Sequence, residues 1–424
     1  MSKAHKGSGL ILKEQLIPVL HHTFHLSCNE DGNASYHGKL ITPEVETYTL
    51  RGGEGIFHDN VIAVEDSTEN LLSTQLGCDC FFTTDEGWTM KNDANYISMI
   101  EKSNSSYYGD YILKVIDNDG NIETNEWGGV YAGVVTNLTP LTNYTMSIRY
   151  KVVGWTEGDI DVWSHWRDSN GVLSSKSSDY KLDYSTFDGK WHYLENTKSC
   201  PEGYDSKHFY IGMNKTNLGC TILVDAIQFE EKEFATSFVN GSRAQGKLYF
   251  KDVVNPNEFT MSLWFNIPYM HRVSTNNTGI MGNWYHPIIE LCPSSNRGQT
   301  GFSIAAGPEP ANYSRKLRMR FPYGVTSDVV IQDKQWYHLA VTYDGNDYIV
   351  YCNGEIACLY KGGLAPTIYE DTVLMVGGGY YGRANILVND LRIDPIAVSE
   401  NDIKAWYESQ APFYNPYDYR AYGY

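Results

Sequence analysis

Apolar and polar residues alternate along residues 335–355, QWYHLAVTYDGNDYIVYCNGE. The odd positions from 337 to 343 are tyrosine, leucine, valine and tyrosine, which share one face of an extended chain. Asp344-Gly345-Asn346 and Asn353-Gly354 follow the first and second apolar runs and are typical turn residues. Turns this close together leave no room for a crossover helix, so the pattern predicts antiparallel strands.

Short apolar runs bounded by turn residues recur along the rest of the chain, at a spacing typical of antiparallel sheets. They lie at residues 21–27, 61–64, 111–115, 133–135, 144–150, 188–193, 209–212, 222–230, 246–250, 258–268, 301–304, 317–321 and 385–394. The chain is therefore predicted to be all-β, with two antiparallel β-sandwiches.

A short helix is predicted near the end of the chain. Ser399 and Asp402 have the spacing of a helix N-terminus, and apolar residues follow at helical spacing. Prolines in residues 411–424 forbid a longer helix, so a Tyr-rich extended tail is expected. Because exposed aromatic residues favour association, we expect an assembly contact through Trp406, Tyr407, Phe413, Tyr414, Tyr417 and Tyr419, and a homo-oligomer.

Composition narrows the classes of partner. Lys and Arg total 33 against 51 Asp and Glu, a formal net charge of -18. Nucleic acids and anionic membranes attract basic proteins, so neither is an expected partner. Lys13 and Glu14 interrupt the apolar run Leu10-Ile11-Leu12, so we predict no secretory signal peptide and expect synthesis in a cytoplasm. No apolar run reaches the ~18 residues of a transmembrane helix.

Residues 335–355 resemble the laminin-G-like (concanavalin-A-like) jelly-roll domain, through W-x-H-L-A-V-T-Y-D-G followed by V-Y-x-N-G-E. EFTMSLWFNIP at 258–268 resembles an earlier strand of that family, and NILVNDLRID at 385–394 resembles its closing strand. Residues 50–72 approximate the family's first hairpin. The resemblance implies a jelly-roll sandwich.

Residues 70–231 are similar to the β-sandwich carbohydrate-binding modules found beside xylanases and cellulases. The similar features are TPLTNYT at 139–145, D-G-x-W at 188–191 and VDAIQFE at 224–230, in this order. Residues 228–243 and the C-terminal segment resemble parts of bacteriophage tail and baseplate proteins and of related bacteriocins. These resemblances imply a second jelly roll, sugar binding and a place in a phage-like particle.

Five segments are predicted from these boundaries. They are an N-terminal attachment segment at 1–20, a first hairpin at 21–69, the carbohydrate-module-like sandwich at 70–232, the laminin-G-like sandwich at 233–398, and the helix with its tail at 399–424. If the first hairpin belongs to the laminin-G-like sandwich, the other sandwich is inserted within it. Three domains in a row are the alternative.

Aromatic residues gather in one segment of the carbohydrate-module-like sandwich. The flat rings of Trp and Tyr pack against the C–H faces of sugars, and they also fill cores. The glycan-binding candidates are Trp155, Trp163, His165, Trp166, Arg167, Tyr180 and Tyr184. Trp163 and Trp166 are three residues apart, so a regular strand would place one in the core and expose the other.

Calcium is the expected ion. Asp117 and Asp119 lie at alternate positions before Gly120, which suits either an oxygen-ligated cation or a plain β-turn. The module resemblance adds Asp225 as a structural calcium ligand. Cys78-Asp79-Cys80 is a weak zinc pattern, since structural zinc takes four ligands.

No catalytic signature is found: there is no H-E-x-x-H, no G-x-S-x-G and no phosphate loop. Asp159 and Asp161 share a strand face and are an acid pair only in principle. We therefore expect a non-enzymatic phage tail or baseplate protein, located in the particle, that contacts other particle proteins and binds host surface glycans. A purely structural particle protein and a secreted glycan-binding module are the alternatives.

Overall fold

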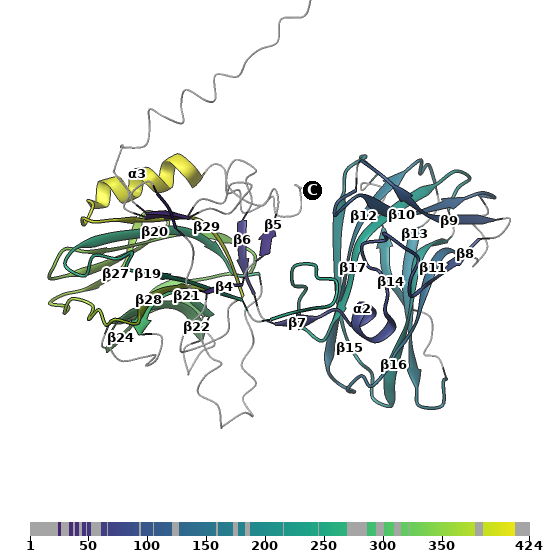
Figure 1. Ribbon diagram of the computed structural model, residues 1–424, viewed down its shortest axis with the longest axis horizontal. Helices are drawn as coiled ribbons and strands as arrows, with labels where there is room; N and C mark the ends of the chain where they lie inside the picture. Colours follow the sequence, from purple (N-terminus) through teal and green to yellow (C-terminus); the bar gives the residue numbers. More distant parts are fainter. Residues whose placement is uncertain are drawn as a thin grey trace, which may run out of the picture. The chain divides into compact units, whose positions relative to one another are not determined.

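The structure of the protein is a computed structural model. It describes residues 24–26, 34–36, 39–41, 45–47, 49–51, 61–65, 67–92, 95–104, 106–120, 127–157, 160–172, 177–182, 187–214, 216–244, 246–268, 286–293, 301–308, 315–321, 323–377 and 385–411. Antiparallel strands dominate these residues, and their helices are α2 (Leu71–Leu76) and α3 (Glu400–Gln410) (Figure 1). The all-β prediction and the short helix near the C-terminus are confirmed. The Tyr-rich tail and the segment 1–20 lie outside the described residues.

The chain forms two compact units. The described residues of unit 1 are 24–65 and 246–411, with the gaps given above, and those of unit 2 run from 67 to 244. Unit 1 is thus built from both sides of unit 2 in the sequence.

Unit 1 is a sandwich of two antiparallel sheets. The first sheet has the order β27-β26-β25-β20-β29-β1-β2-β3, with β6 also paired to β29 and β5 paired to β6. Its strands are β27 (Glu355–Tyr360), β26 (Tyr348–Cys352), β25 (Trp336–Tyr343), β20 (Phe259–Asn266), β29 (Ile386–Asp394), β1 (Phe24–Leu26), β2 (Ala34–Tyr36), β3 (Lys39–Ile41), β6 (Val61–Val64) and β5 (Thr49–Arg51). The second sheet consists, in order, of β24 (Tyr323–Val330), β23 (Arg315–Phe321), β22 (Phe302–Pro308), β21 (His286–Pro293), β28 (Thr372–Val376), β19 (Lys247–Lys251) and β4 (Val45–Thr47).

The hairpins predicted at 335–355 form as expected. β25 pairs with β26 and β26 pairs with β27, all antiparallel. Gly345, Asn353 and Gly354 have φ values of 92°, 52° and 79°, the left-handed region that tight hairpin turns require. Tyr337, Leu339, Val341 and Tyr343 face the sandwich core, where each is at most 5% exposed.

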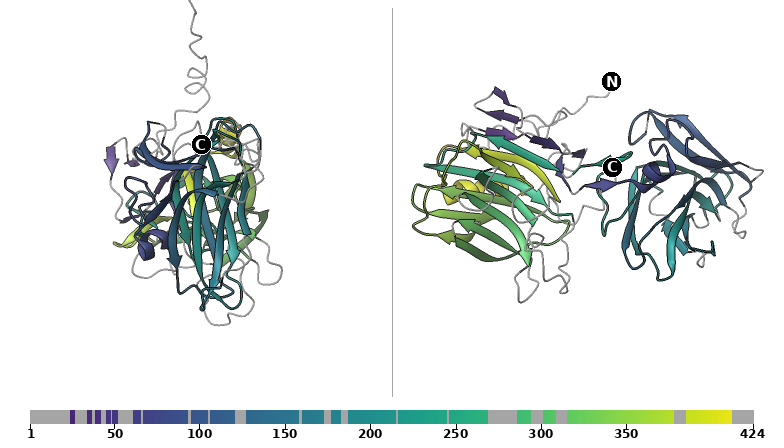
Figure 2. Two further views of the ribbon diagram at one scale, coloured as in Figure 1. Left: turned by 90° about the vertical axis from the view of Figure 1, so that its right-hand side faces the viewer. Right: turned by 60° about the horizontal axis from the view of Figure 1, so that its bottom comes forward.

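Unit 2 is a second sandwich, of two five-stranded antiparallel sheets (Figure 2). One sheet consists, in order, of β15 (His192–Ser199), β12 (Asn143–Val153), β17 (Thr221–Glu230), β10 (Tyr111–Asp117) and β9 (Tyr96–Lys102). The other consists, in order, of β14 (Ser177–Leu182), β13 (Ile160–Asp168), β16 (Tyr204–Asn214), β11 (Trp127–Val135) and β8 (Trp88–Lys91). A single apolar cluster fills the space between them.

The chain enters and leaves unit 2 at neighbouring points. β7 (Thr68–Glu69) pairs antiparallel with β18 (Ser242–Arg243). Within unit 1, the Gly246 N–H donates to the Glu65 carbonyl at 2.7 Å. Because both crossings lie side by side, unit 2 occupies what would otherwise be a loop of unit 1.

Candidate functional site

The outer face of the sheet β14-β13-β16-β11-β8 in unit 2 carries aromatic and basic side chains. Along β16, Phe209, Ile211 and Met213 point into the core and are fully buried. His208 and Tyr210 alternate with them and are therefore on the outer face, where both are partly buried. Outer faces of solvated sheets usually carry small polar side chains, so these rings are a candidate binding surface.

The neighbouring strand β13 adds basic groups to this face. His165 pairs in register with His208, and Arg167 pairs with Ser206. Trp166, between them, pairs with Lys207 and is 5% exposed, inside the core. His165 and Arg167 therefore lie on the same outer face as His208 and Tyr210.

Tyr131 of β11 completes the cluster from the other side. It pairs with Tyr210, and their ring centroids lie 6.3 Å apart. The Tyr131 ring meets His208 edge-on at 5.9 Å, and the His165 ring meets Tyr210 edge-on at 5.6 Å. We call Tyr131, His165, Arg167, His208 and Tyr210 the β16 face.

Two members of the β16 face are hydrogen-bonded to each other. The Tyr210 hydroxyl lies 2.9 Å from Nδ1 of His208. Burial, and then the nearby Arg167 and His165 charges, lower the pKa of His208 below its ordinary value. Burial raises the pKa of Tyr210. At neutral pH the imidazole is therefore neutral and the phenol is protonated.

The predicted glycan-binding residues separate into three groups. His165 and Arg167 lie on the β16 face. Trp155 and Trp166 are core residues at 2% and 5% exposure, so neither presents a ring to a ligand, and their assignment is corrected. The side chains of Trp163 and Tyr180, and Tyr184 as a whole, lie outside the described residues.

Tyr131, His208 and Tyr210 were missed by reasoning from the sequence. The alternation in HFYIGMN at 208–214 separates His208 and Tyr210 from the apolar set, which was a usable signal. That alternation does not tell which set faces solvent, because aromatic residues are common on both faces.

A second aromatic cluster lies on the opposite sheet of unit 2. The Arg149 guanidinium carbon lies 4.3 Å from the ring centres of both Tyr107 and Tyr193. Beneath it, the buried Asp225 accepts hydrogen bonds from the backbone N–H groups of Tyr107 and Tyr108 at 2.9 and 2.8 Å. Arg149 balances the Asp225 charge, so this cluster fastens a loop onto the sheet.

The three predicted calcium ligands do not gather around one point. In register, Asp117 is next to the residue pair Ile116–Thr221, so Asp225 is several positions, roughly 13–16 Å, further along β17. Asp117 Oδ1 accepts from the N–H groups of Asp119 and Gly120, and Oδ2 accepts from the Thr216 hydroxyl. These bonds describe a closed turn, and a shared ion for all three residues is ruled out by distance. Calcium at either place alone stays a prediction.

No group of three or more His, Cys, Asp or Glu side chains suited to a metal occurs in the part of the chain that the structure describes. Cys78 and Cys80 are buried free thiols, and burial raises the pKa of Cys78 to about 12. These thiols pack in the core of unit 2.

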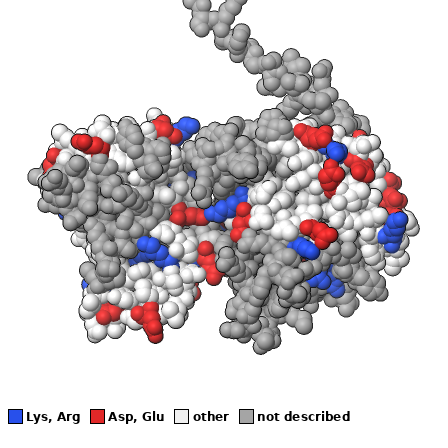
Figure 3. All heavy atoms as spheres, turned by 180° about the vertical axis from the view of Figure 1, so that it is seen from behind, with Lys and Arg blue, Asp and Glu red and all other residues white. Residues whose placement is uncertain are grey.

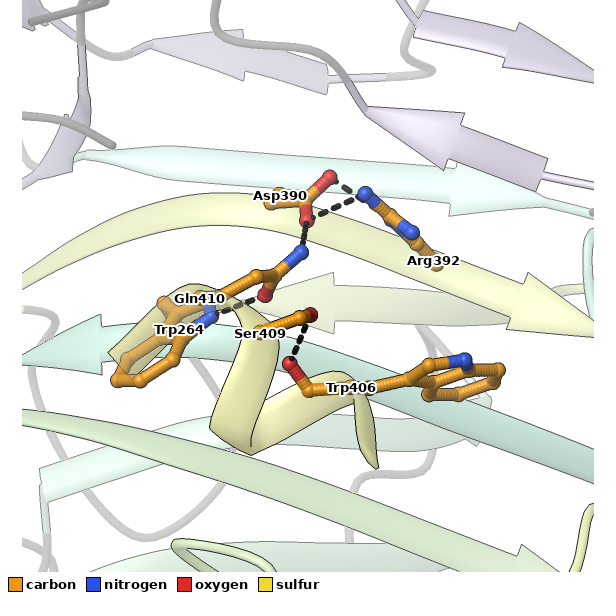
Figure 4. A network of polar contacts seen from close by, with 6 residues as sticks. All are labelled: Trp264, Asp390, Arg392, Trp406, Ser409 and Gln410. Atoms are coloured by element: carbon orange, nitrogen blue, oxygen red, sulfur yellow. Dashed lines mark hydrogen bonds and ion pairs between the residues drawn. The ribbon is translucent and has the colours of Figure 1, made fainter. Parts of the chain in front are cut away.

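Trp406 and Tyr407, predicted as assembly residues, pack within their own chain (Figure 4). α3 covers the outer face of the first sheet of unit 1, where Trp406 is 3% exposed and Tyr407 stacks on Trp264 at 5.9 Å. Gln410 accepts from Nε1 of Trp264 at 2.6 Å and donates to Asp390 at 3.0 Å. Trp406 and Tyr407 are therefore corrected from assembly contacts to packing residues. Phe413, Tyr414, Tyr417 and Tyr419 lie outside the described residues.

On the side of the molecule shown in Figure 3, acidic and basic side chains are interspersed over the described surface. Among the described residues, no helix is long and apolar enough to cross a membrane.

Residues 235–404 match the family of the concanavalin A-like lectin/glucanases superfamily. Unit 1 therefore contains a concanavalin A-like jelly-roll domain, as the sequence resemblance implied. A search of curated protein sequences finds no match.

Solved structures with partial similarity include three binding domains. Domain 4 of AbnA, an extracellular arabinanase from Geobacillus stearothermophilus, in complex with arabinotriose, is 16% identical with a TM-score of 0.27, over 38% of this chain and 71% of that chain. The CBM22-1 xylan-binding domain of Paenibacillus barcinonensis Xyn10C is 16% identical with a TM-score of 0.28, over 41% and 98%. The binding domain of Paraclostridial Mosquitocidal Protein 1 is 18% identical with a TM-score of 0.29, over 38% and 40%.

Proposed function

We propose that this protein is a non-enzymatic glycan-binding protein and that the β16 face of unit 2 holds the saccharide. The observation that carries the proposal is the exposure of two tyrosine rings beside three basic groups on the outer face of a sheet. A sugar ring places its C–H face on such rings at little entropic cost. The basic and hydroxyl groups are donors for sugar oxygens.

The rigid backbone beneath the β16 face supports this role. β16 is paired on both sides, with β13 and with β11, and its inward side chains are fully buried. A platform on a central strand keeps its geometry without the ligand, which lowers the entropic cost of binding.

We further propose that the protein acts in a phage tail or baseplate-like particle and attaches it to host surface glycans. Support comes from the sequence resemblance of residues 228–243 and of the C-terminal segment to such proteins. In this arrangement unit 2 contacts the host, and the residues beyond 411 contact other particle proteins or a second copy.

The test measures binding of the purified protein to a glycan array and to cell walls of candidate hosts. The double variant Tyr131→Ala/Tyr210→Ala is compared with Tyr193→Ala, which removes a partly exposed tyrosine from the opposite sheet. Saturable binding that is lost only in the double variant supports the proposal. Absence of binding to every glycan and wall, with all proteins folded, would leave the purely structural function.

A further inference from the structure

We infer that the saccharide bound on the β16 face is anionic, carrying a carboxylate or a phosphate that Arg167 binds. This inference rests on the proposed function and narrows its ligand class. Neutral sugars need only rings and neutral donors, so the basic groups require a separate explanation.

Arg167 is the main reason. Its side chain is partly buried and its Nε is fully buried, with no hydrogen-bond partner. No ion pair or side-chain hydrogen bond of its guanidinium occurs among the described residues. A partly buried cation without a partner is unfavourable, and a bidentate anion would satisfy the planar N–H groups.

The groups around Arg167 reinforce a positive potential. The charges that act on His208 and Tyr210 are those of Arg167, His165 and the neighbouring Tyr131, and the first two are basic. Asp168 is the acidic neighbour in sequence. Its Oδ1 accepts from the N–H groups of Asn170 and Val172, which engages it in its own turn. A basic surface in a chain of net charge -18 therefore marks this place for an anion.

The His208–Tyr210 pair makes the site sensitive to protons. His208 donates a ring N–H to the Ala132 carbonyl, so the neutral ring accepts the Tyr210 hydroxyl proton at Nδ1. When Nδ1 takes up a proton, it donates to the Tyr210 oxygen instead, and the Tyr210 hydroxyl becomes free to donate to a ligand oxygen. Protonation thus adds one positive charge and one donor toward the ligand.

The groups that face His208 are Arg167 and His165 from β13, Tyr210 from β16 and Tyr131 from β11. An anion bound among them offsets the repulsion from Arg167 and favours the imidazolium. Binding of an anionic saccharide therefore strengthens as pH falls from about 7.5 to about 5.5, whereas binding of a neutral one does not.

The experiment titrates the full-length protein with three classes of saccharide by calorimetry. The classes are neutral plant and bacterial polysaccharides, uronate polymers, and phosphate-bearing wall polymers. The variants are Arg167→Gln and His208→Asn. The matched control is Lys102→Gln, which removes one charge from an exposed ion pair on the opposite sheet.

We expect tight binding to a uronate or phosphate polymer, weakened by roughly 10- to 100-fold in Arg167→Gln and unchanged in Lys102→Gln. Added salt weakens it, and His208→Asn abolishes its pH dependence. Which anionic polymer binds separates a carboxylate from a phosphate ligand. Equal binding of neutral and anionic polymers, unaffected by Arg167→Gln but lost in Tyr131→Ala/Tyr210→Ala, would overturn this inference and keep the proposed function. No binding to any class would overturn both.

Discussion

Asn70 holds together the two ends of unit 2, and its replacement by alanine is predicted to destabilise that unit specifically. The side chain is fully buried. Its Nδ2 donates to the carbonyls of Ile227 and Val239 at 2.9 and 3.0 Å. Its Oδ1 accepts from the N–H groups of Leu72 and Phe229 at 3.3 and 3.2 Å.

The substitution Asn70→Ala would leave four backbone groups without these partners. A buried polar group that loses its partner costs about 1–3 kcal/mol, and the loss of the helix N-cap on α2 is included in that range. Water regains some of these bonds, so we expect a loss of roughly 3–5 kcal/mol. Domains of this size have unfolding free energies of about 5–15 kcal/mol, so the effect is large.

Scanning calorimetry and urea unfolding of the full-length protein measure this loss. We expect the transition of unit 2 to shift to lower temperature and lower urea concentration while the transition of unit 1 stays in place. Asn143→Ala is the control, because its amide is exposed and makes one long bond, of 3.5 Å to Glu233. A shift in Asn70→Ala no larger than in Asn143→Ala would refute the reasoning.

Two further perturbations follow from packing and charge. Trp406→Ala should lower the unfolding free energy of unit 1 by about 3–5 kcal/mol, because the ring is 3% exposed between α3 and the sheet; chemical denaturation measures it, and an unchanged midpoint would contradict the packing described. Burial raises the pKa of Asp225 to about 6, above its ordinary value of roughly 4. Its protonated form therefore contributes stability below about pH 4 that is lost as pH rises through about 6. Asp225→Asn should flatten the change in melting temperature over that window, and an identical pH profile would count against it.

The strands nearest the turn signals were predictable from the sequence. Around Asn353 and Gly354 the local pattern is sufficient, because alternation and positive-φ residues act within a few positions. Helix α3 was also predictable, since Ser399 caps it through its hydroxyl and the apolar spacing is local. Pairing between β1 and β29 joins residues far apart in the chain, and no local pattern specifies such a partner.

The candidate site was predictable only in part. Sequence reasoning selected β13, and His165 and Arg167 do lie on the β16 face. It placed Trp166 among the binding candidates because periodicity tells which residues share a face, and not which face is buried. For the same reason the apolar face of α3 indicated a docking partner, and that partner is the sheet of its own unit.

Hydrogen exchange of the full-length protein, with and without a saturating saccharide, tests the central claim most directly. The account predicts slower exchange in peptides of β11, β13 and β16, with exchange in the β12 and β15 peptides unchanged. Saturable binding that instead protects only unit 1, or only the opposite sheet of unit 2, would contradict it.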